Sequence, residues 1–147
     1  MGTEAGRARR DSLIKELYVE HLPALLMLDE ALNQAGAETE VEDILGEAII
    51  LPAVDVVLGQ ELRLTAADRV AGSLPRQIKA AAQRENIELP DGWKASVAIH
   101  LVSSWAEQKT TLPADALDRA ATVFSAARRR FAQMEQPGAD TSTAGGV

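Results

Sequence analysis

The chain has 147 residues, the size of one ordinary domain, with 15 Lys and Arg against 22 Asp and Glu for a net charge of −7. It contains no cysteine, which excludes disulfide bonds, thiolate metal sites and a cysteine nucleophile. No run of about 18 apolar residues occurs, and the first residues lack the apolar segment of a signal peptide. We therefore expect a cytoplasmic protein without a membrane span.

The composition favours helices. Alanine, the best helix former, occurs 26 times, whereas only five residues are aromatic. Small side chains allow helices to pack closely. We predict an all-α fold, a compact bundle of five to seven helices, with residues 11–136 forming a single domain. Residues 1–10 are predicted to be a flexible N-terminus, and the small, polar residues 137–147 a disordered tail.

Residues 11–35 are predicted to form two helices. Asp11 is placed to cap a helix over residues 11–21. Pro23 then either kinks that helix or starts a second one, which we expect over residues 24–35. Gly36 is well placed to end the second helix.

The next segment contains one ambiguous stretch. Thr39 and Glu42 have the spacing of a capping box, which predicts that a third helix starts here. Residues 49–58 are rich in β-branched side chains and contain Pro52, so a buried strand is an alternative. Because no other segment offers a strand partner, we favour a buried, proline-kinked helix ending at Gly59.

Glycine, serine and proline residues mark the ends and starts of the following helices. Residues 65–71 are predicted to form a short helix that Gly72 ends, and Ser73 is predicted to cap the next one, with Pro75 in its first turn. A further helix over about residues 92–108 has an apolar stripe of residues spaced four apart. The stripe consists of Trp93, Val97, Leu101 and Trp105.

The last helix, from about Pro113 to residue 136, has the most regular pattern. Its apolar residues alternate in steps of three and four, as in a heptad seam. These interaction candidates are Leu117, Ala120, Phe124, Ala127, Phe131 and Met134. Because a short loop usually joins packed neighbours, the seam is predicted to pack against the helix over residues 92–108. Pairing with a second copy of the chain is the alternative.

No motif indicates a particular function, and we interpret the chain as a non-enzymatic protein acting through protein–protein contacts. It would be an adaptor, an assembly factor or a small structural subunit whose partner is another protein or itself. Residues 16–62 contain eleven acids and no Lys or Arg. This asymmetry could guide association with a partner, or the acids could form a solvated face.

The alternative hypothesis is a DNA-binding regulator with a degenerate helix-turn-helix at residues 65–84. Its candidate contacts are Arg76, Gln77, Lys79, Gln83 and Arg84. Asp68 and Pro75 depart from that motif, and the acidic net charge opposes an approach to DNA. Residues 128–130 are three arginines whose charge suits the end of a helix without any ligand.

We predict no catalytic residue, no metal and no cofactor. His100 lies one helical turn from Ser104, but no third member of a catalytic triad is identifiable. Neither His21 nor His100 has a glutamate three residues before it, as a di-metal helical bundle requires. The sequence also lacks a glycine-rich phosphate loop and zinc-ligand spacing.

Overall fold

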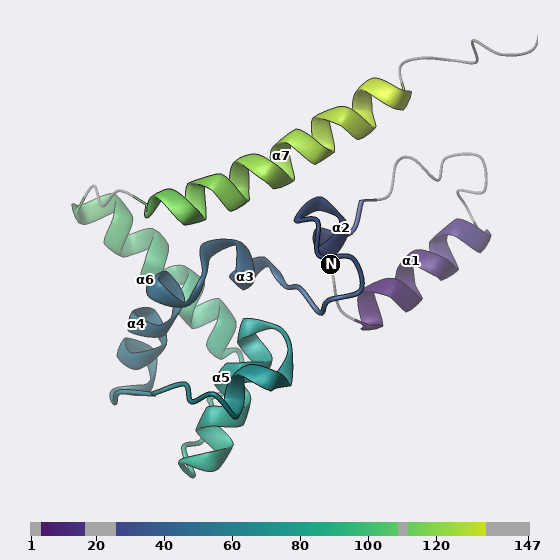
Figure 1. Cartoon of the computed structure of the whole chain (residues 1–147). Coiled ribbons are helices and arrows are strands. Elements are labelled where there is room, and N and C mark those ends of the chain that lie inside the picture. Colours follow the sequence, from purple (N-terminus) through teal and green to yellow (C-terminus); the bar gives the residue numbers. More distant parts are fainter. Residues whose placement is uncertain (1–3, 17–25, 109–111, 135–147) are drawn as a thin grey trace, which may run out of the picture.

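The prediction of an all-α multi-helix bundle is confirmed. The computed structural model describes residues 4–16, 26–108 and 112–134, and all regular secondary structure in these ranges is helical (Figure 1). The described ranges contain seven α-helices and one 3-10 helix. None of these helices is both long and apolar enough to cross a bilayer. The tail predicted over residues 137–147 lies outside the described ranges.

The first helix, α1 (Glu4–Glu16), begins well before the predicted start. Asp11 therefore lies inside the helix, where its carboxylate is 3.5 Å from Nε of Arg10, and the prediction that it caps the helix is wrong. Residues 4–10, which the sequence places in a flexible N-terminus, are helical because they consist largely of Glu, Ala and Arg, which are good helix formers. Residues 17–25, including Pro23, lie outside the described ranges.

The second helix, α2 (Leu28–Ala31), is a single turn, much shorter than the predicted helix over residues 24–35. It ends because Asn33 adopts a left-handed conformation, with φ of +58°. The carboxylate of Asp29 then accepts a hydrogen bond from the N–H of Gly36 at 2.9 Å, which folds the chain back on itself. Gly36 thus lies in the loop and does not end the helix.

The third helix, α3 (Val41–Leu45), starts one residue later than the predicted capping box implies. Its N-cap is Glu40, whose backbone N–H donates to Oδ2 of Asp43 at 2.7 Å. Thr39, the predicted cap, is instead buried. The interaction has the expected chemistry but is shifted by one residue.

Residues 49–58 are helical, which decides the ambiguous stretch in favour of the preferred interpretation. They belong to α4 (Glu47–Leu58), which contains Pro52 and ends at Gly59 in the left-handed region, with φ of +68°. Gly46, with φ of +84°, separates α3 from α4. The sequence indicates no break between the third helix and the helix that contains Pro52, whereas in the structure Gly46 supplies one.

The predicted glycine and proline signals are confirmed in the next segment. The 3-10 helix η2 (Asp68–Ala71) is followed by Gly72, with φ of +106°. Helix α5 (Leu74–Arg84) starts directly afterwards, with Pro75 in its first turn. Proline fits there because the first backbone N–H groups of a helix have no partner within the helix.

The hydrophobic core lies between α4, α5 and α6 (Trp93–Gln108). The predicted stripe of α6 faces this core: Trp93, Val97 and Leu101 are buried, and Trp105 packs against them. Each large apolar side chain that is fully removed from water contributes about 1.5–3 kcal/mol. The buried cluster consists of Ile50, Ala53, Val54, Leu62, Leu74, Ile78, Ala81, Ala82, Trp93, Val97 and Leu101.

The last helix, α7 (Ala114–Met134), has the predicted position and length, but its main neighbours are different. It runs along one side of the molecule and packs chiefly against α3 and α2 (Figure 1). The sequence predicts packing against α6 instead. The heptad seam is therefore not the surface by which α7 joins the bundle.

Candidate interaction surface

One face of α7 presents large apolar side chains that remain exposed. We call this face the α7 stripe. Its phenylalanines, Phe124 and Phe131, expose 70% and 65% of their surface, and Leu117 and Met134 expose 50% and 45%. The two alanines of the predicted seam are half-buried between these residues. The α7 stripe comprises Leu117, Ala120, Phe124, Ala127, Phe131 and Met134.

The adjoining face of α7 makes the contact with the bundle through small side chains. Ala116 and Ala126 expose only 2% and 6% of their surface, and Val123 is half-buried. Small residues let α7 approach α3 and α2 closely. The apolar surface of α7 is thus wider than its contact within the chain, and the α7 stripe is the part left uncovered.

Arg119 fixes the N-terminal half of α7 to the end of α3. Its Nε donates a hydrogen bond to the carbonyl of Ile44 at 2.8 Å, and its Nη2 donates to the carbonyl of Leu45 at 3.1 Å. These carbonyls belong to the C-terminal turn of α3, where a cation is favourable. The guanidinium also lies against Gly46, where an added Cβ would come within 2.5 Å of Nη2.

The C-terminal half of α7 is held by an ion-pair cluster. Glu30 of α2 lies 3.6 Å from Arg130 of α7 and 2.7 Å from Arg10 of α1. One carboxylate therefore links three helices. Since α7 is held near both ends, its rotation is set and the α7 stripe faces outward.

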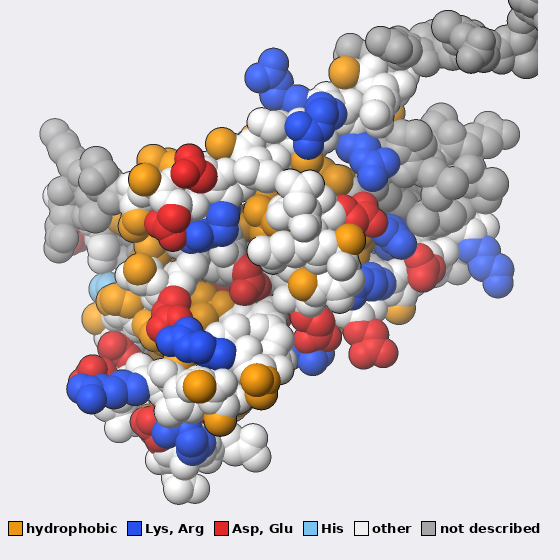
Figure 2. Space-filling model, viewed as in Figure 1, with side chains coloured by type: hydrophobic (Ala, Val, Ile, Leu, Met, Phe, Trp, Pro, Cys, Tyr) orange, Lys and Arg blue, Asp and Glu red, His pale blue; other side chains and the backbone are white. Residues whose placement is uncertain are grey.

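The acidic segment is largely neutralised within the chain. Each of the nine acids between residues 29 and 61 contacts a basic side chain or a backbone N–H. Basic and acidic side chains accordingly lie next to one another over the face shown in Figure 2. The basic partners come from elsewhere in the chain: Arg7, Arg10, Arg63, Arg69, Arg76, Lys94 and Arg130.

A polar junction joins α3, α5 and α6. Glu40 accepts hydrogen bonds from Lys94 and from Oγ of Ser73, the latter at 2.7 Å. Burial is the largest single effect and raises the pKa of Glu40, but these two hydrogen bonds and the charges of Lys94 and Lys79 together outweigh it, so the net pKa is lowered. Burial dominates at Asp43 and raises its pKa, although Asp43 accepts the N–H of Leu74 at 2.8 Å. The hydroxyl of Ser73 therefore does not cap α5, because Asp43 of α3 does.

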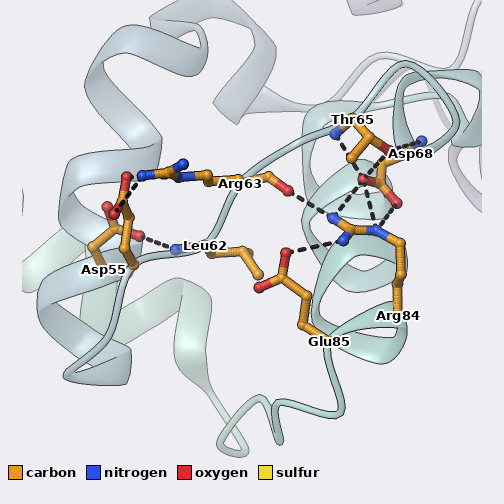
Figure 3. A network of polar contacts seen from close by, with 8 residues as sticks. Asp55, Leu62, Arg63, Thr65, Asp68, Arg84 and Glu85 are labelled. Atoms are coloured by element: carbon orange, nitrogen blue, oxygen red, sulfur yellow. Dashed lines mark hydrogen bonds and ion pairs between the residues drawn. The ribbon is translucent and has the colours of Figure 1, made fainter.

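A second polar network fastens η2 to α5 (Figure 3). Arg84 donates to the buried carboxylate of Asp68 at 2.9 Å and to the carbonyl of Arg63 at 2.7 Å. Asp68 also accepts the N–H and the hydroxyl of Thr65, at 2.8 and 2.7 Å. The hydrogen bond from Arg84, followed by those from Thr65, lowers the pKa of Asp68 to about 2. Arg84 and Asp68 thus stabilise the contact between η2 and α5.

Three of the five nucleic-acid candidates are engaged within the chain. Arg76 lies 2.6 Å from Glu38, and Gln77 donates to the carbonyl of Gly72 at 2.7 Å. Arg84 belongs to the network just described. The structure thus directs these side chains toward their own fold.

The remaining two candidates, Lys79 and Gln83, are exposed on α5. The element before the turn is η2, a single 3-10 turn in place of the first α-helix of a helix-turn-helix. The structure therefore does not bring the five side chains together on one uncommitted surface.

The described residues do not form a recognisable catalytic site. Nε2 of His100 lies 3.4 Å from Oγ of Ser104, a long contact between neighbouring turns of α6. An apolar groove of about 170 Å³ lies between α3, α4 and α6. Its charged groups, Glu42 and Lys94, pair with each other at 3.1 Å. In the described part of the chain, no three His, Asp or Glu residues are grouped to hold a metal ion.

Comparison of the chain with protein-family models, curated proteins and solved structures finds no match. The site is therefore defined by its own geometry. The periodicity of the sequence groups the apolar residues of the α7 stripe on one face, but it does not point to Arg119, which holds that helix on α3. No local pattern could reveal that role, because its carbonyl partners lie about 75 residues earlier in the chain.

Proposed function

We propose that this is a non-enzymatic helical protein that acts in the cytoplasm through protein–protein contacts, as an adaptor, assembly factor or small structural subunit. We propose further that the α7 stripe is its contact surface. The observation that carries the proposal is the exposure of Phe124 and Phe131 in line with Leu117 and Met134 on one helix, while smaller residues of that helix are buried. Contiguous exposed apolar surface of this kind is typical of interaction sites.

The physical reason is the free energy available on burial. Covering apolar surface is worth about 25 cal/mol per Å². Aromatic side chains also provide large contact area and dominate many interfaces. The 21 residues of α7 span roughly 30 Å at a rise of about 1.5 Å per residue, so one partner helix could contact the whole stripe.

The anchoring of α7 adds to the case. Arg119 and Arg130 hold the helix near its two ends, so the α7 stripe is ordered before a partner arrives. A pre-ordered surface loses less conformational entropy on binding than a flexible one.

Site-specific photo-crosslinking tests the proposal. A photoreactive phenylalanine analogue at position 124 should give covalent adducts with protein in extracts of the source cells, either a second copy or another protein. The same analogue at position 125, exposed on a different face of α7, is the matched control and should give few adducts. Equal adduct yields at the two positions, or none at either, would contradict the proposal.

A further inference from the structure

We infer that the occupant of the α7 stripe is a second copy of this chain, bound by antiparallel contact between the two α7 helices. The inference rests on the proposed function, because it names the partner of the same surface. It is carried by the self-complementarity of the stripe in residue size and in charge, together with its exposure.

Residue size is complementary in the antiparallel arrangement. The stripe alternates a large residue with an alanine at its centre, in steps of three and four. When two such helices run in opposite directions, the large position of one can face the small position of the other. Phe124 then lies opposite the partner's Ala127, and Phe131 lies opposite the partner's Ala120. Large residues facing small ones fill the layers of an interface evenly.

The ends of the stripe fit the same register. Leu117 lies opposite the partner's Met134, so two flexible apolar side chains close each end of the contact. A twofold axis relates the two halves, as in the commonest protein dimers. Each residue of the stripe therefore has a counterpart in the second copy.

A parallel arrangement is worse in both respects. It would place Phe124 against the partner's Phe124 and Ala127 against the partner's Ala127, which crowds one layer and leaves a gap in the next. It would also bring Arg128 beside its own copy, with Arg129 and Arg130 nearby. In the antiparallel pair, Arg128 instead lies opposite the partner's Val123, in the half of α7 whose charged residues are Asp115, Asp118 and Arg119, so the two arginine clusters are kept apart.

The available area predicts a reversible dimer. A fully buried phenylalanine removes roughly 150–250 Å² from contact with water. At their observed exposures of 70% and 65%, Phe124 and Phe131 provide roughly 200–350 Å² per copy. With Leu117 and Met134 the two copies together bury somewhat less than the ~1,200 Å² at the lower end of stable interfaces. We therefore expect a micromolar dissociation constant.

The chain's own C-terminal segment fits the stripe less well. Residues 135–147 contain no aromatic residue, Leu, Ile or Met, and valine occurs only at the last position. Such a segment has little apolar surface that could be removed from contact with water on binding. A second copy, which brings two phenylalanines, matches the stripe better.

Sedimentation equilibrium of the full chain tests the inference. Dimer should accumulate as the concentration passes through the micromolar range. Phe124→Glu should weaken dimerisation by roughly 100-fold or more, because it places unpaired charges in an apolar contact. Ser125→Glu adds the same charge one residue away on an exposed face and should change the dissociation constant by less than about threefold. Far-ultraviolet circular dichroism verifies that both variants remain helical.

Engineered cysteines test the direction of the pair, because the natural chain has none. Positions 117 and 134 lie 17 residues apart, about 25 Å along the helix, whereas a disulfide needs Cα atoms within about 7 Å. A mixture of Leu117→Cys and Met134→Cys should form disulfide-linked dimers on oxidation, and neither variant should do so alone. Linkage within each single variant, but not in the mixture, would overturn the antiparallel arrangement.

The outcomes separate this inference from the proposed function. A monomer at every concentration, with photo-crosslinking from position 124 to a different protein, overturns the dimer but leaves the contact surface in place. A monomer with no adduct from position 124 overturns both. Dimerisation unaffected by Phe124→Glu would place the self-contact elsewhere and overturn the inference.

Discussion

Replacement of Arg119 by alanine should destabilise the protein by about 2–4 kcal/mol. This side chain is the main polar link between α7 and α3, through hydrogen bonds of 2.8 and 3.1 Å to the carbonyls of Ile44 and Leu45. Removing the guanidinium leaves both carbonyls at the end of α3 without their charged donor. The effect should therefore exceed that of removing an ordinary surface arginine.

The magnitude follows from the geometry. Two hydrogen bonds from a charged donor contribute about 3–6 kcal/mol together, and a cation at a helix C-terminus adds about 0.3–1 kcal/mol. The Arg119 side chain retains 30% of its exposure, so solvent screening reduces this sum to about 2–4 kcal/mol. A loss of about 2–4 kcal/mol is a large part of the ~5–15 kcal/mol that stabilises a typical domain.

Urea denaturation followed by circular dichroism measures the change. With a slope of about 1–3 kcal/mol per molar urea, the midpoint should fall by roughly 1–2 M. Asp115→Ala is the matched control, since it removes only the exposed carboxylate that pairs with Arg119 at 2.9 Å. That variant should keep nearly the original midpoint. If Arg119→Ala also unfolded at the original midpoint, the anchoring of α7 through α3 would be refuted.

Three further predictions concern stability. Gly46→Ala should cost about 1–3 kcal/mol, measured as a lower melting temperature, because its φ of +84° disfavours a side chain and the new Cβ would meet Arg119. Ile78→Ala should cost about 2–5 kcal/mol in urea denaturation, because Ile78 has no exposed surface. The third concerns acid: Asp68 has a pKa of about 2 in the fold against an ordinary 3.8. Its ionised form therefore stabilises the protein fully above about pH 4, and this contribution is lost as the pH falls toward 2. Asp68→Asn should flatten that part of the pH dependence of thermal melting.

Each of these predictions has a control or an opposing outcome. Gly36→Ala has a similar φ of +89° but open space around the new Cβ, so the difference from Gly46→Ala isolates the contact with Arg119. Ile99→Ala changes a side chain that is 68% exposed and should have little effect. A steep acid transition retained in Asp68→Asn would show that another carboxylate controls unfolding at low pH.

The sequence predicts best those elements whose signals are local. Gly72 and Pro75 mark the boundary between η2 and α5, and the four-residue spacing of the α6 stripe identifies its buried face. Such signals work because a positive φ, a proline in a first turn or an apolar face is encoded within a few residues. The helix over residues 49–58, which is also confirmed, is favoured for a different reason, because no other segment offers a strand partner.

Some of the wrong predictions concern contacts between residues far apart in the chain. Helix α7 packs chiefly on α3 and α2 rather than on α6, and Arg119 holds it there through carbonyls about 75 residues earlier. Helix α5 is capped by Asp43, 31 residues before Leu74, although Ser73 is in the expected position. No window of neighbouring residues contains both partners of such an interaction.

The exposed face of α7 shows both kinds of information. The sequence by itself determined the heptad spacing of the stripe, because periodicity depends only on the order of the residues. Only the tertiary structure decided that this face remains uncovered, since Arg119 and the small residues Ala116 and Ala126 dock α7 on α3 and α2.

The charges follow the same division. The sequence alone shows that acidic residues occupy the segment 29–61 and that basic residues lie before and after it. Whether those acids face a partner or their own chain depends on which helices meet. The fold brings the flanking arginines and Lys94 against them, because pairing within a folded chain requires no second molecule and satisfies charges that packing has partly removed from water.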